Sequence, residues 1–366
     1  MTVPSARALV LEAPRRLEPR SLPIPEVADD DGVLRVEACG LCGTDHEQFT
    51  GELWGGFAFV PGHEIVGVVE ALGSRAAARW GVQVGDRVAV EVFQSCRDCA
   101  ACRDGVHRRC ERHGLADMYG FMALDRAPGL WGGYAEYLYL APDAQVLAVP
   151  VALDPVEATL FNPVGAAIRW AVTVPGTAAG DAVAVLGPGI RGLAAVVALR
   201  RAGAGPILVT GAGTRDAKRL ALARDLGADA TVDVERDDPV RALRDLTGGA
   251  LADVVVDVTA KAPAALGQAV ALARPGGTVV LAGTRGSAET PGFHPDMVVY
   301  KELRMLGALG VDVAAYRAAL DLLASDTSPF RGLAHTTSGL EATPDLLRLM
   351  AGDAEGDRPV HAVVVP

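Results

Sequence analysis

The stretch Ala182–Ala202, AVAVLGPGIRGLAAVVALRRA, decides the fold of this chain. An apolar run leads into Gly187-x-Gly189-x-x-Gly192, and a second apolar run follows. As strand, turn and helix, this pattern is typical of a dinucleotide-binding loop. The first glycine allows a tight turn, the second lets a pyrophosphate approach the backbone, and the third lets the helix pack on the strand. A glycine-rich turn that only connects strand to helix is the structural alternative. The residues expected to bind a coenzyme here are Gly187, Pro188, Gly189, Ile190, Arg191 and Gly192.

From this strand and loop onward, strands and helices alternate, which indicates parallel β–α–β units whose strands are buried on both faces. The predicted strands are Ala182–Leu186, Ile207–Thr210, Val254–Val258 and Thr278–Ala282, and the predicted helices are Leu193–Ala202, Asp216–Leu226 and Pro263–Ala273. We therefore expect an α/β fold with a Rossmann domain, a doubly wound parallel sheet, over residues 153–294.

The first 150 residues show short strand-like runs that are separated by glycine and proline rather than by helical segments. The predicted strands are Ala6–Leu11, Val33–Ala38, Ile65–Ala71, Arg87–Val92 and Tyr134–Leu140. This pattern predicts a mostly antiparallel, barrel-like β domain over residues 1–152. We expect residues 295–366 to rejoin that domain and to end in a short strand.

The chain has 366 residues and a formal net charge of −11, with 34 Lys and Arg against 45 Asp and Glu. Its length suits about two domains, and its acidity argues against a nucleic-acid partner. Residues 1–20 carry several charges and no apolar signal segment, and the longest apolar stretch is interrupted by Arg191. We therefore expect a cytoplasmic protein that does not enter a membrane.

Four cysteines lie within fifteen residues, at Cys96, Cys99, Cys102 and Cys110. Four thiolates at this spacing can surround one Zn²⁺ tetrahedrally, and such a closed site leaves no position for a substrate. We therefore predict a structural zinc in the lobe 93–113. An iron–sulfur cluster and a set of free surface thiols are the alternatives.

A second group of possible metal ligands lies earlier in the chain. Cys42 is followed about twenty residues later by His63 and Glu64. One thiolate, one imidazole and one carboxylate would leave a fourth zinc position open for water or a substrate oxygen. We predict a catalytic zinc here.

Taken together, these motifs resemble the zinc-dependent medium-chain alcohol dehydrogenases, in particular their polyol, threonine and glucose dehydrogenase branch. The motifs that carry the resemblance are Gly40-Leu-Cys42-Gly-Thr44-Asp45, Gly62-His63-Glu64, the four-cysteine lobe, Trp131-Gly-Gly-Tyr-Ala-Glu136 and the Gly187 loop. The resemblance covers nearly the whole chain and implies a GroES-like catalytic domain beside the Rossmann domain.

The resemblance also implies roles for single residues. Cys42 and His63 would bind the catalytic zinc, and Glu64 would be a third ligand or a close neighbour that exchanges with water. Thr44 would accept the alcohol proton, and Asp45 would orient the ligating histidine. Cys39 is not a ligand in the family, and we expect it to be a small buried residue.

Two positions depart from the family pattern. Many relatives carry a histidine five residues after the ligand cysteine; here Glu47 holds that position and His46 precedes it. Glu47 would then take part in the proton relay, and His46 would be either part of it or a rim residue. Asn162 stands where an acid usually precedes Pro163. An amide there would make the site more electropositive, or the site would rely more on the carboxylate of Glu64.

The choice of coenzyme depends on the tip of the second predicted strand. No acid stands there; Gly211 leaves room and Arg215 supplies charge for a 2′-phosphate, which favours NADP over NAD. The alternative is that Asp216 binds the ribose of NAD and that Lys218 and Arg219 belong to a solvated helix face. The further coenzyme residues that we expect are Thr259 and Gly283.

We therefore predict an NAD(P)-dependent dehydrogenase that transfers a hydride reversibly between a secondary alcohol or polyol and the nicotinamide. Zinc would lower the pKa of the alcohol, and the coenzyme would accept the hydride. Two zinc ions per chain and a homodimer or homotetramer follow from the resemblance. The alternatives are a quinone- or enone-reductase-like enzyme without catalytic zinc and a non-catalytic nucleotide-binding protein on the same fold.

Overall fold

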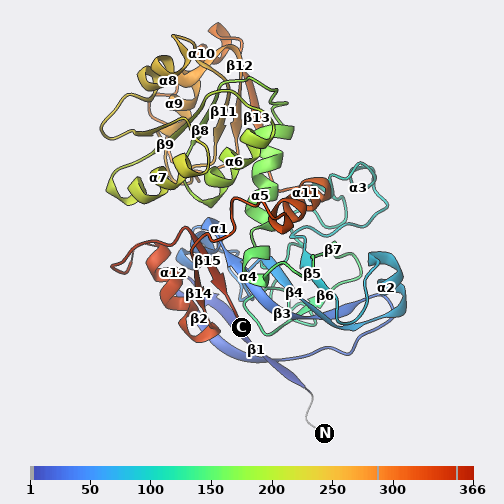
Figure 1. Cartoon of the computed structure of the whole chain (residues 1–366). Coiled ribbons are helices and arrows are strands. Elements are labelled where there is room, and N and C mark those ends of the chain that lie inside the picture. The colour runs from blue at the N-terminus through green and yellow to red at the C-terminus, as the bar shows by residue number, and fades with distance from the viewer. Residues whose placement is uncertain (1–3, 287, 352) are drawn as a thin grey trace. The chain divides into compact units, whose positions relative to one another are not determined.

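The computed structural model of the chain describes residues 4–286, 288–351 and 353–366 (Figure 1). The chain divides into two compact units. The first unit comprises Met1–Asn162 and Asp312–Pro366, and the second comprises Pro163–Val311.

A six-stranded, fully parallel sheet forms the centre of the second unit. Its order is β10-β9-β8-β11-β12-β13, which is the 3-2-1-4-5-6 order of a Rossmann fold. The strands are β8 (Val183–Leu186), β9 (Ile207–Gly211), β10 (Ala230–Asp233), β11 (Ala252–Asp257), β12 (Ala273–Leu281) and β13 (Arg304–Gly307). The strand order reverses between β8 and β11, and ligands of such sheets bind at the carboxyl ends beside this reversal.

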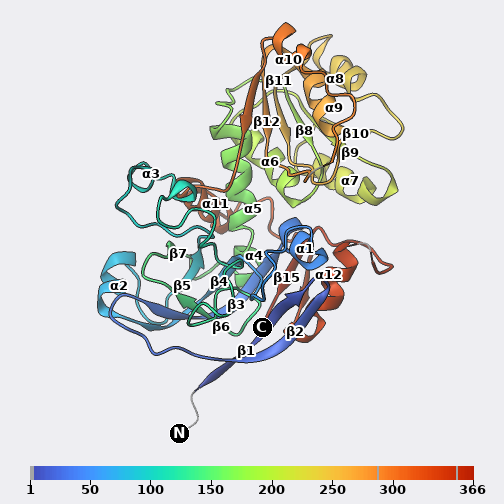
Figure 2. The same ribbon diagram turned by 180° about the vertical axis from the view of Figure 1, so that it is seen from behind.

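Helices cover both faces of this sheet (Figures 1 and 2). The α-helices that follow β8 in this unit are α6 (Ile190–Arg201), α7 (Ala217–Asp225), α8 (Pro239–Thr247), α9 (Ala265–Leu272) and α10 (Asp296–Tyr300). Helix α6 packs against α7, and α8 packs against α9. Every residue of α6 from Gly192 to Leu199 is buried, which explains why this helix is apolar on all sides.

The predicted alternation of strands and helices is confirmed in this unit, but β10, α8 and β13 were not predicted. Strand β10 is short and only one of its residues is buried, so its sequence lacks the apolar run that reveals a central strand. Strand β13 pairs with β12 as the outermost strand. The prediction that residues from 295 onward rejoin the first domain is therefore wrong for 295–311, because β13 completes the parallel sheet. The structure places the boundaries at 162/163 and 311/312 instead of 152/153 and 294/295.

The first unit is built on a mostly antiparallel sheet of order β14-β15-β3-β4-β5-β7, with β6 also paired to β3. Its strands are β3 (Gly32–Leu41), β4 (Glu64–Leu72), β5 (Arg87–Val90), β6 (Tyr137–Leu140), β7 (Val146–Ala148), β14 (His335–Ser338) and β15 (His361–Val364). Strands β1 (Ser5–Ala13) and β2 (Arg16–Pro23) form a separate hairpin. The predicted C-terminal strand is confirmed, since β15 pairs with β3 from the opposite end of the sequence.

Short helices connect these strands. They are α1 (Gly43–Thr50), α2 (Ser74–Trp80), α3 (Ala100–Arg103), α4 (Pro155–Ala158), α11 (Val313–Ala324) and α12 (Thr343–Ala351). Helix α5 (Phe161–Ala167) continues into a π-helix, Ile168–Thr173, at the start of the second unit. Within the described ranges, no helix combines the length and the apolar character that crossing a bilayer requires.

Two histidines face each other across the parallel pair β14–β15. Nδ1 of His335 lies 2.8 Å from Nδ1 of His361, and Nε2 of His361 lies 3.3 Å from the Thr159 hydroxyl. Burial, together with the neighbouring His335, lowers the pKa of His361 to about 3. The folded chain therefore keeps His361 neutral at pH values where an unfolded chain would protonate it.

We predict that this histidine destabilises the protein in acid. Because the unfolded state takes up a proton between about pH 6.5 and 3 that the folded state refuses, stability falls as the pH falls through that range. His361→Asn should reduce the drop in Tm between pH 7 and pH 4 by roughly 2 °C or more. The exposed His294→Asn is the control and should leave the drop unchanged; an equal drop in wild type and His361→Asn contradicts the prediction.

Candidate metal and coenzyme sites

Helix α1 begins at Cys42, and its first turn forms a capping box. Sγ of Cys42 accepts a hydrogen bond from the Thr44 N–H at 3.3 Å, while Oδ2 of Asp45 accepts one from the Cys42 N–H at 2.9 Å. The spacing Cys-x-x-Asp thus takes the place of the usual Ser/Thr-x-x-Glu. A thiolate at a helix N-terminus is stabilised by the free N–H groups, which suits a metal ligand.

His63 faces the same thiol. Its Nε2 lies 3.3 Å from Sγ of Cys42, and its Nδ1 lies 3.6 Å from Oδ1 of Asp45. Burial acts to lower the pKa of His63, but the negative charges of Cys42 and Asp45 outweigh it and raise the pKa to about 10. The site therefore attracts positive charge: either a proton on the imidazole or a metal ion in its place.

A close backbone approach fixes the position of His63. The N–H of Gly133 donates to Gly62 O at 2.9 Å, and the N–H of Tyr134 donates to Pro61 O at 3.0 Å. Gly62 has a φ of 90°, and a Cβ at this position would lie 2.6 Å from the Tyr134 ring. A side chain at residue 62, next to His63 in the chain, would therefore clash with Tyr134.

These residues fit a metal ion. Ligand atoms of Cys42, Asp45 and His63 all lie within 4.8 Å of one another, and all three residues are buried. Oδ1 of Asp45 and Nδ1 of His63 have no hydrogen-bond partner among the described residues. With a metal on Nε2, Nδ1 must carry the proton and would donate it to Asp45, so the metal would complete the pair.

Glu64, expected as a third ligand, does not join this group of three. Its Oε2 lies beside Gly40, where a Cβ would come within 2.5 Å of it. The alternative expectation, in which Glu64 is a close neighbour of the metal that exchanges with water, stays a prediction.

The expected relay residues lie on α1, and Asn162 lies in the first turn of α5. Thr44 is half-buried in the first turn of α1, and His46 and Glu47 are half-buried further along the helix. Asn162 is buried, and its Nδ2 donates to the Tyr316 hydroxyl at 3.1 Å. Cys39 is fully buried, as expected for a residue that is not a ligand.

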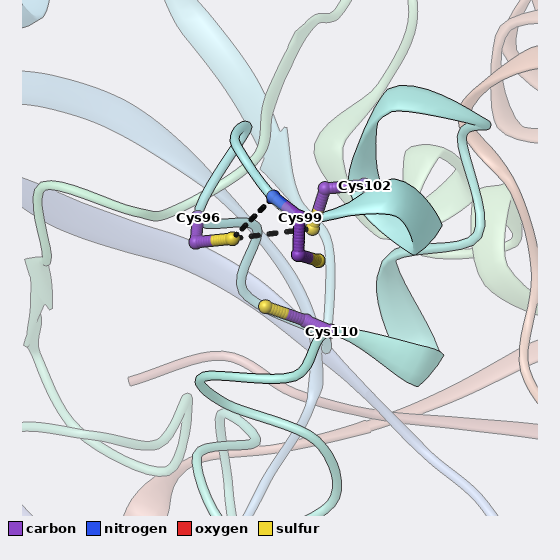
Figure 3. A group of neighbouring side chains, drawn as sticks. All are labelled: Cys96, Cys99, Cys102 and Cys110. Atoms are coloured by element: carbon purple, nitrogen blue, oxygen red, sulfur yellow. Dashed lines mark hydrogen bonds between the residues drawn. The ribbon is translucent and has the colours of Figure 1, made fainter.

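The structure brings the four cysteines of the lobe together. Their side chains point toward a common centre (Figure 3), and the four sulfurs lie within 4.8 Å of one another. Cys99 caps helix α3, Cys102 lies in it, and Cys110 follows a 3₁₀ turn. Local turns of the chain therefore suffice to build the site.

Backbone N–H groups stabilise thiolates in the lobe. Hydrogen bonds from the backbone of Glu111 and Cys102 lower the pKa of Cys99. Burial opposes ionisation of Cys110, but hydrogen bonds from the backbone of Cys96, His113 and Arg112 lower its pKa to about 6. In the same group burial raises the pKa of Cys102 to about 12, so the backbone favours ionisation of Cys99 and Cys110 rather than of every thiol. Four mutually close sulfurs suit a metal ion that is bound entirely by sulfur.

The predicted glycine loop lies between β8 and α6 at the carboxyl edge of the parallel sheet. Gly187 has a φ of 100°, which only glycine adopts readily. A Cβ at Gly192 would lie 1.9 Å from Gly187 O, so this glycine is required for α6 to approach the loop. A Cβ at Gly189 would meet nothing within 4 Å, so the second glycine is not explained by packing within the chain. It leaves open the surface at the N-terminus of α6, where phosphates bind.

The structure brings the other expected coenzyme residues to the same edge. A Cβ at Gly187 would lie 3.0 Å from Cγ2 of Thr259, and one at Gly283 would lie 1.8 Å from Thr259 O. Arg191 lies in the first turn of α6 with its guanidinium 5.7 Å from the centre of the Trp170 ring.

Two residues at this edge were not predicted. The buried Asp257 ends β11 and forms an ion pair with Arg285, and its Oδ1 accepts from the Thr259 N–H and hydroxyl at 3.0 and 2.6 Å. The carboxylate therefore holds the Thr259 turn in place. The sequence shows that Asp257 stands at the end of an apolar run. Nothing in the sequence indicates that it pairs with Arg285.

Both carboxylate oxygens of Asp216 have partners near the tip of β9. Its Oδ2 accepts from the Ala212 N–H at 2.9 Å, and its Oδ1 lies 3.6 Å from Nη1 of Arg219. Arg215 is exposed, and Gly211 packs against Pro188 of the glycine loop.

Comparison with known proteins matches both halves of the chain. Residues 28–151 match the family model described as "Alcohol dehydrogenase GroES-like domain", and residues 192–325 match "Zinc-binding dehydrogenase". The chain is 67% identical to "Probable alcohol dehydrogenase adh" of Mycobacterium tuberculosis, with 98% of each chain covered. The chain belongs to the zinc-dependent medium-chain alcohol dehydrogenases.

More distant relatives agree with this assignment. Sorbitol dehydrogenase of Bacillus subtilis is 30% identical, with 94% of each chain covered. The solved structure of a "putative zinc-binding dehydrogenase" from Sinorhizobium meliloti bound to NADP is 30% identical, with a TM-score of 0.83 and coverage of 99% of this chain and 100% of that one. This member of the family is an NAD(P)-dependent alcohol dehydrogenase with a GroES-like and a Rossmann domain. The predictions of family, fold class and enzyme class are confirmed.

Two variants of the glycine loop separate coenzyme binding from folding. Gly189→Ala places a methyl in open space, so Tm should stay within about 1 °C of wild type while coenzyme affinity falls about tenfold. Gly192→Ala forces α6 away from the loop and should lower Tm as well. Thermal unfolding and nicotinamide fluorescence titration measure the two effects. Unchanged coenzyme affinity in Gly189→Ala contradicts the placement of the phosphates.

Proposed function

We propose that the enzyme oxidises secondary alcohols or polyols, and reduces the matching ketones, at the Cys42–His63 site. The observation that carries the proposal is the buried group of Cys42, Asp45 and His63, which combines a thiolate, an imidazole and a carboxylate around a point that attracts cations. A catalytic zinc with these ligands would act as a Lewis acid on the substrate oxygen. The sorbitol and erythritol/L-threitol dehydrogenases among the relatives support the polyol class.

In this proposal each residue has a separate task. Cys42 and His63 hold the metal, Asp45 orients His63, and Glu64 is a neighbouring carboxylate that can exchange with water. Thr44 accepts the substrate proton from its position in the first turn of α1, and Glu47, one helical turn further along, passes it toward solvent. Cys96, Cys99, Cys102 and Cys110 hold a second, structural zinc, since four mutually close thiolates close the coordination sphere.

We further propose that the enzyme prefers NADP and works as a homodimer or homotetramer in the cytoplasm. The relative from Sinorhizobium meliloti was solved with NADP, and Asp216 is already engaged by Ala212 and Arg219. We assign the 2′-phosphate to the exposed Arg215, which follows the tip of β9.

Arg215→Ala tests the coenzyme preference. If Arg215 binds the 2′-phosphate, KM for NADP should rise about tenfold while KM for NAD stays unchanged, because only NADP carries that phosphate. Initial rates with one substrate and both coenzymes measure the effect. An equal change for the two coenzymes would show that Arg215 does not select between them.

The function itself is tested with a panel of secondary alcohols, polyols and sugars, read by nicotinamide absorbance. Wild type should contain about two zinc ions per chain. Cys42→Ser should lose one zinc and turnover yet keep its Tm and coenzyme binding, whereas Cys102→Ser should lose the other zinc together with stability. One zinc in wild type and turnover that survives Cys42→Ser would favour a zinc-independent reductase.

A further inference from the structure

Four buried polar atoms around His63 have no hydrogen-bond partner among the described residues. They are Oδ1 of Asp45, Oε1 of Gln48, Nδ1 of His63 and the hydroxyl of Tyr134. Only three other side-chain atoms in the described chain share this condition, and none belongs to these residues. Because buried polar groups are normally paired, such a concentration at one place calls for a functional explanation.

Tyr134 and Gln48 border the histidine from two sides. The Tyr134 ring packs against Gly62, the residue before His63, and Tyr134 is fully buried. Gln48 donates from Nε2 to Gly120 O at 3.0 Å, and a Cβ at Gly120 would lie 3.1 Å from Cβ of His63. Tyr134 thus packs beside the residue that precedes His63, and Gln48 binds the backbone of a residue that packs against His63.

A metal on Nε2 would give the four atoms complementary donor and acceptor roles. With a metal on Nε2, Nδ1 of His63 would carry a proton and act as a hydrogen-bond donor. The Tyr134 hydroxyl would be the second donor. The two acceptors would be Oδ1 of Asp45 and Oε1 of Gln48. Nδ1 has its acceptor in Asp45, 3.6 Å away. A carboxylate oxygen has lone pairs for a second donor, and it is a stronger acceptor than an amide oxygen.

The electrostatic surroundings of Tyr134 point to the same acceptor. Burial, followed by the charge of Asp45, raises the pKa of Tyr134 well above its ordinary value. The charges of Cys39, Cys42 and Glu64 act on it more weakly than that of Asp45. The tyrosine therefore remains a neutral O–H donor, and the charge of Asp45 acts on it more strongly than those of the other neighbours.

We propose that Tyr134 is a positioning residue for the metal site: its hydroxyl donates to Asp45 through one water molecule, and so holds Asp45 against the imidazole of His63. This inference rests on the proposed metal site at Cys42 and His63. It goes beyond the ligands themselves, because it makes metal affinity depend on a side chain that does not touch the metal.

The test is Tyr134→Phe, which removes the hydroxyl and keeps the ring. Zinc affinity is measured by competition with a chromophoric chelator, and the four-cysteine site on the same chain serves as an internal reference. We expect affinity at the Cys42–His63 site to fall roughly 10- to 100-fold while the cysteine site is unchanged. Tyr119→Phe is the matched control: Tyr119 is also fully buried, but its hydroxyl accepts from the Ala141 N–H at 2.9 Å. It should lower Tm and leave both zinc affinities unchanged.

A second measurement asks whether Tyr134 acts through Asp45. In an Asp45→Asn background, Tyr134→Phe should lower the zinc affinity of the Cys42–His63 site by less than about threefold, because the effects of coupled residues are not additive. The inference is overturned if Tyr134→Phe binds zinc like wild type. It is also overturned if Tyr134→Phe lowers zinc affinity by the same factor in the wild-type and the Asp45→Asn proteins. If wild type itself binds a single zinc that Cys42→Ser does not remove, the proposed metal site has failed.

Discussion

The carboxylate of Asp45 connects the fold of the first unit with its chemistry. One oxygen accepts from the Cys42 N–H and starts helix α1, and the other faces Nδ1 of His63. The same side chain therefore sets the direction of the thiolate and of the imidazole, although the two ligands lie about twenty residues apart in the chain. Few substitutions could preserve both contacts, because a shorter or neutral side chain would lose the cap, the histidine or both.

This arrangement leaves negative charge inside the protein, which is costly unless a cation compensates it. Burial acts to lower the pKa of His63, but the negative charges of Cys42 and Asp45 raise it to about 10, so the site favours a proton on the imidazole or a metal ion. A divalent ion would replace that proton and allow Asp45 to accept the remaining N–H. In the four-cysteine lobe the negative charge is stabilised differently, because backbone N–H groups donate hydrogen bonds to Cys99 and Cys110 and lower their pKa values.

The two sites differ in how far the sequence predicts them. The lobe is local: four cysteines within fifteen residues, separated by tight turns, leave little choice of geometry. The glycine loop is also local, and Gly187 and Gly192 perform the roles that their spacing indicates. The Cys42 site instead combines α1, the segment before β4 and the turn at Tyr134, so the family pattern could suggest its ligands but not the unpaired atoms around them. The Asp257–Arg285 pair depends likewise on the neighbouring strands β11 and β12.

The amino-acid sequence by itself determined the fold class, the glycine loop, the closed cysteine lobe and the candidate ligands Cys42 and His63, because each depends on spacing over a few residues or on the period of apolar side chains. Only the tertiary structure decided that residues 295–311 complete the parallel sheet and that Asp45, rather than Glu64, lies within ligand distance of Cys42 and His63. It also decided that Tyr134 and Gln48 border that site. The physical reason is that these relations are set by strand pairing and close backbone packing between segments far apart in the chain, about which local propensity carries no information.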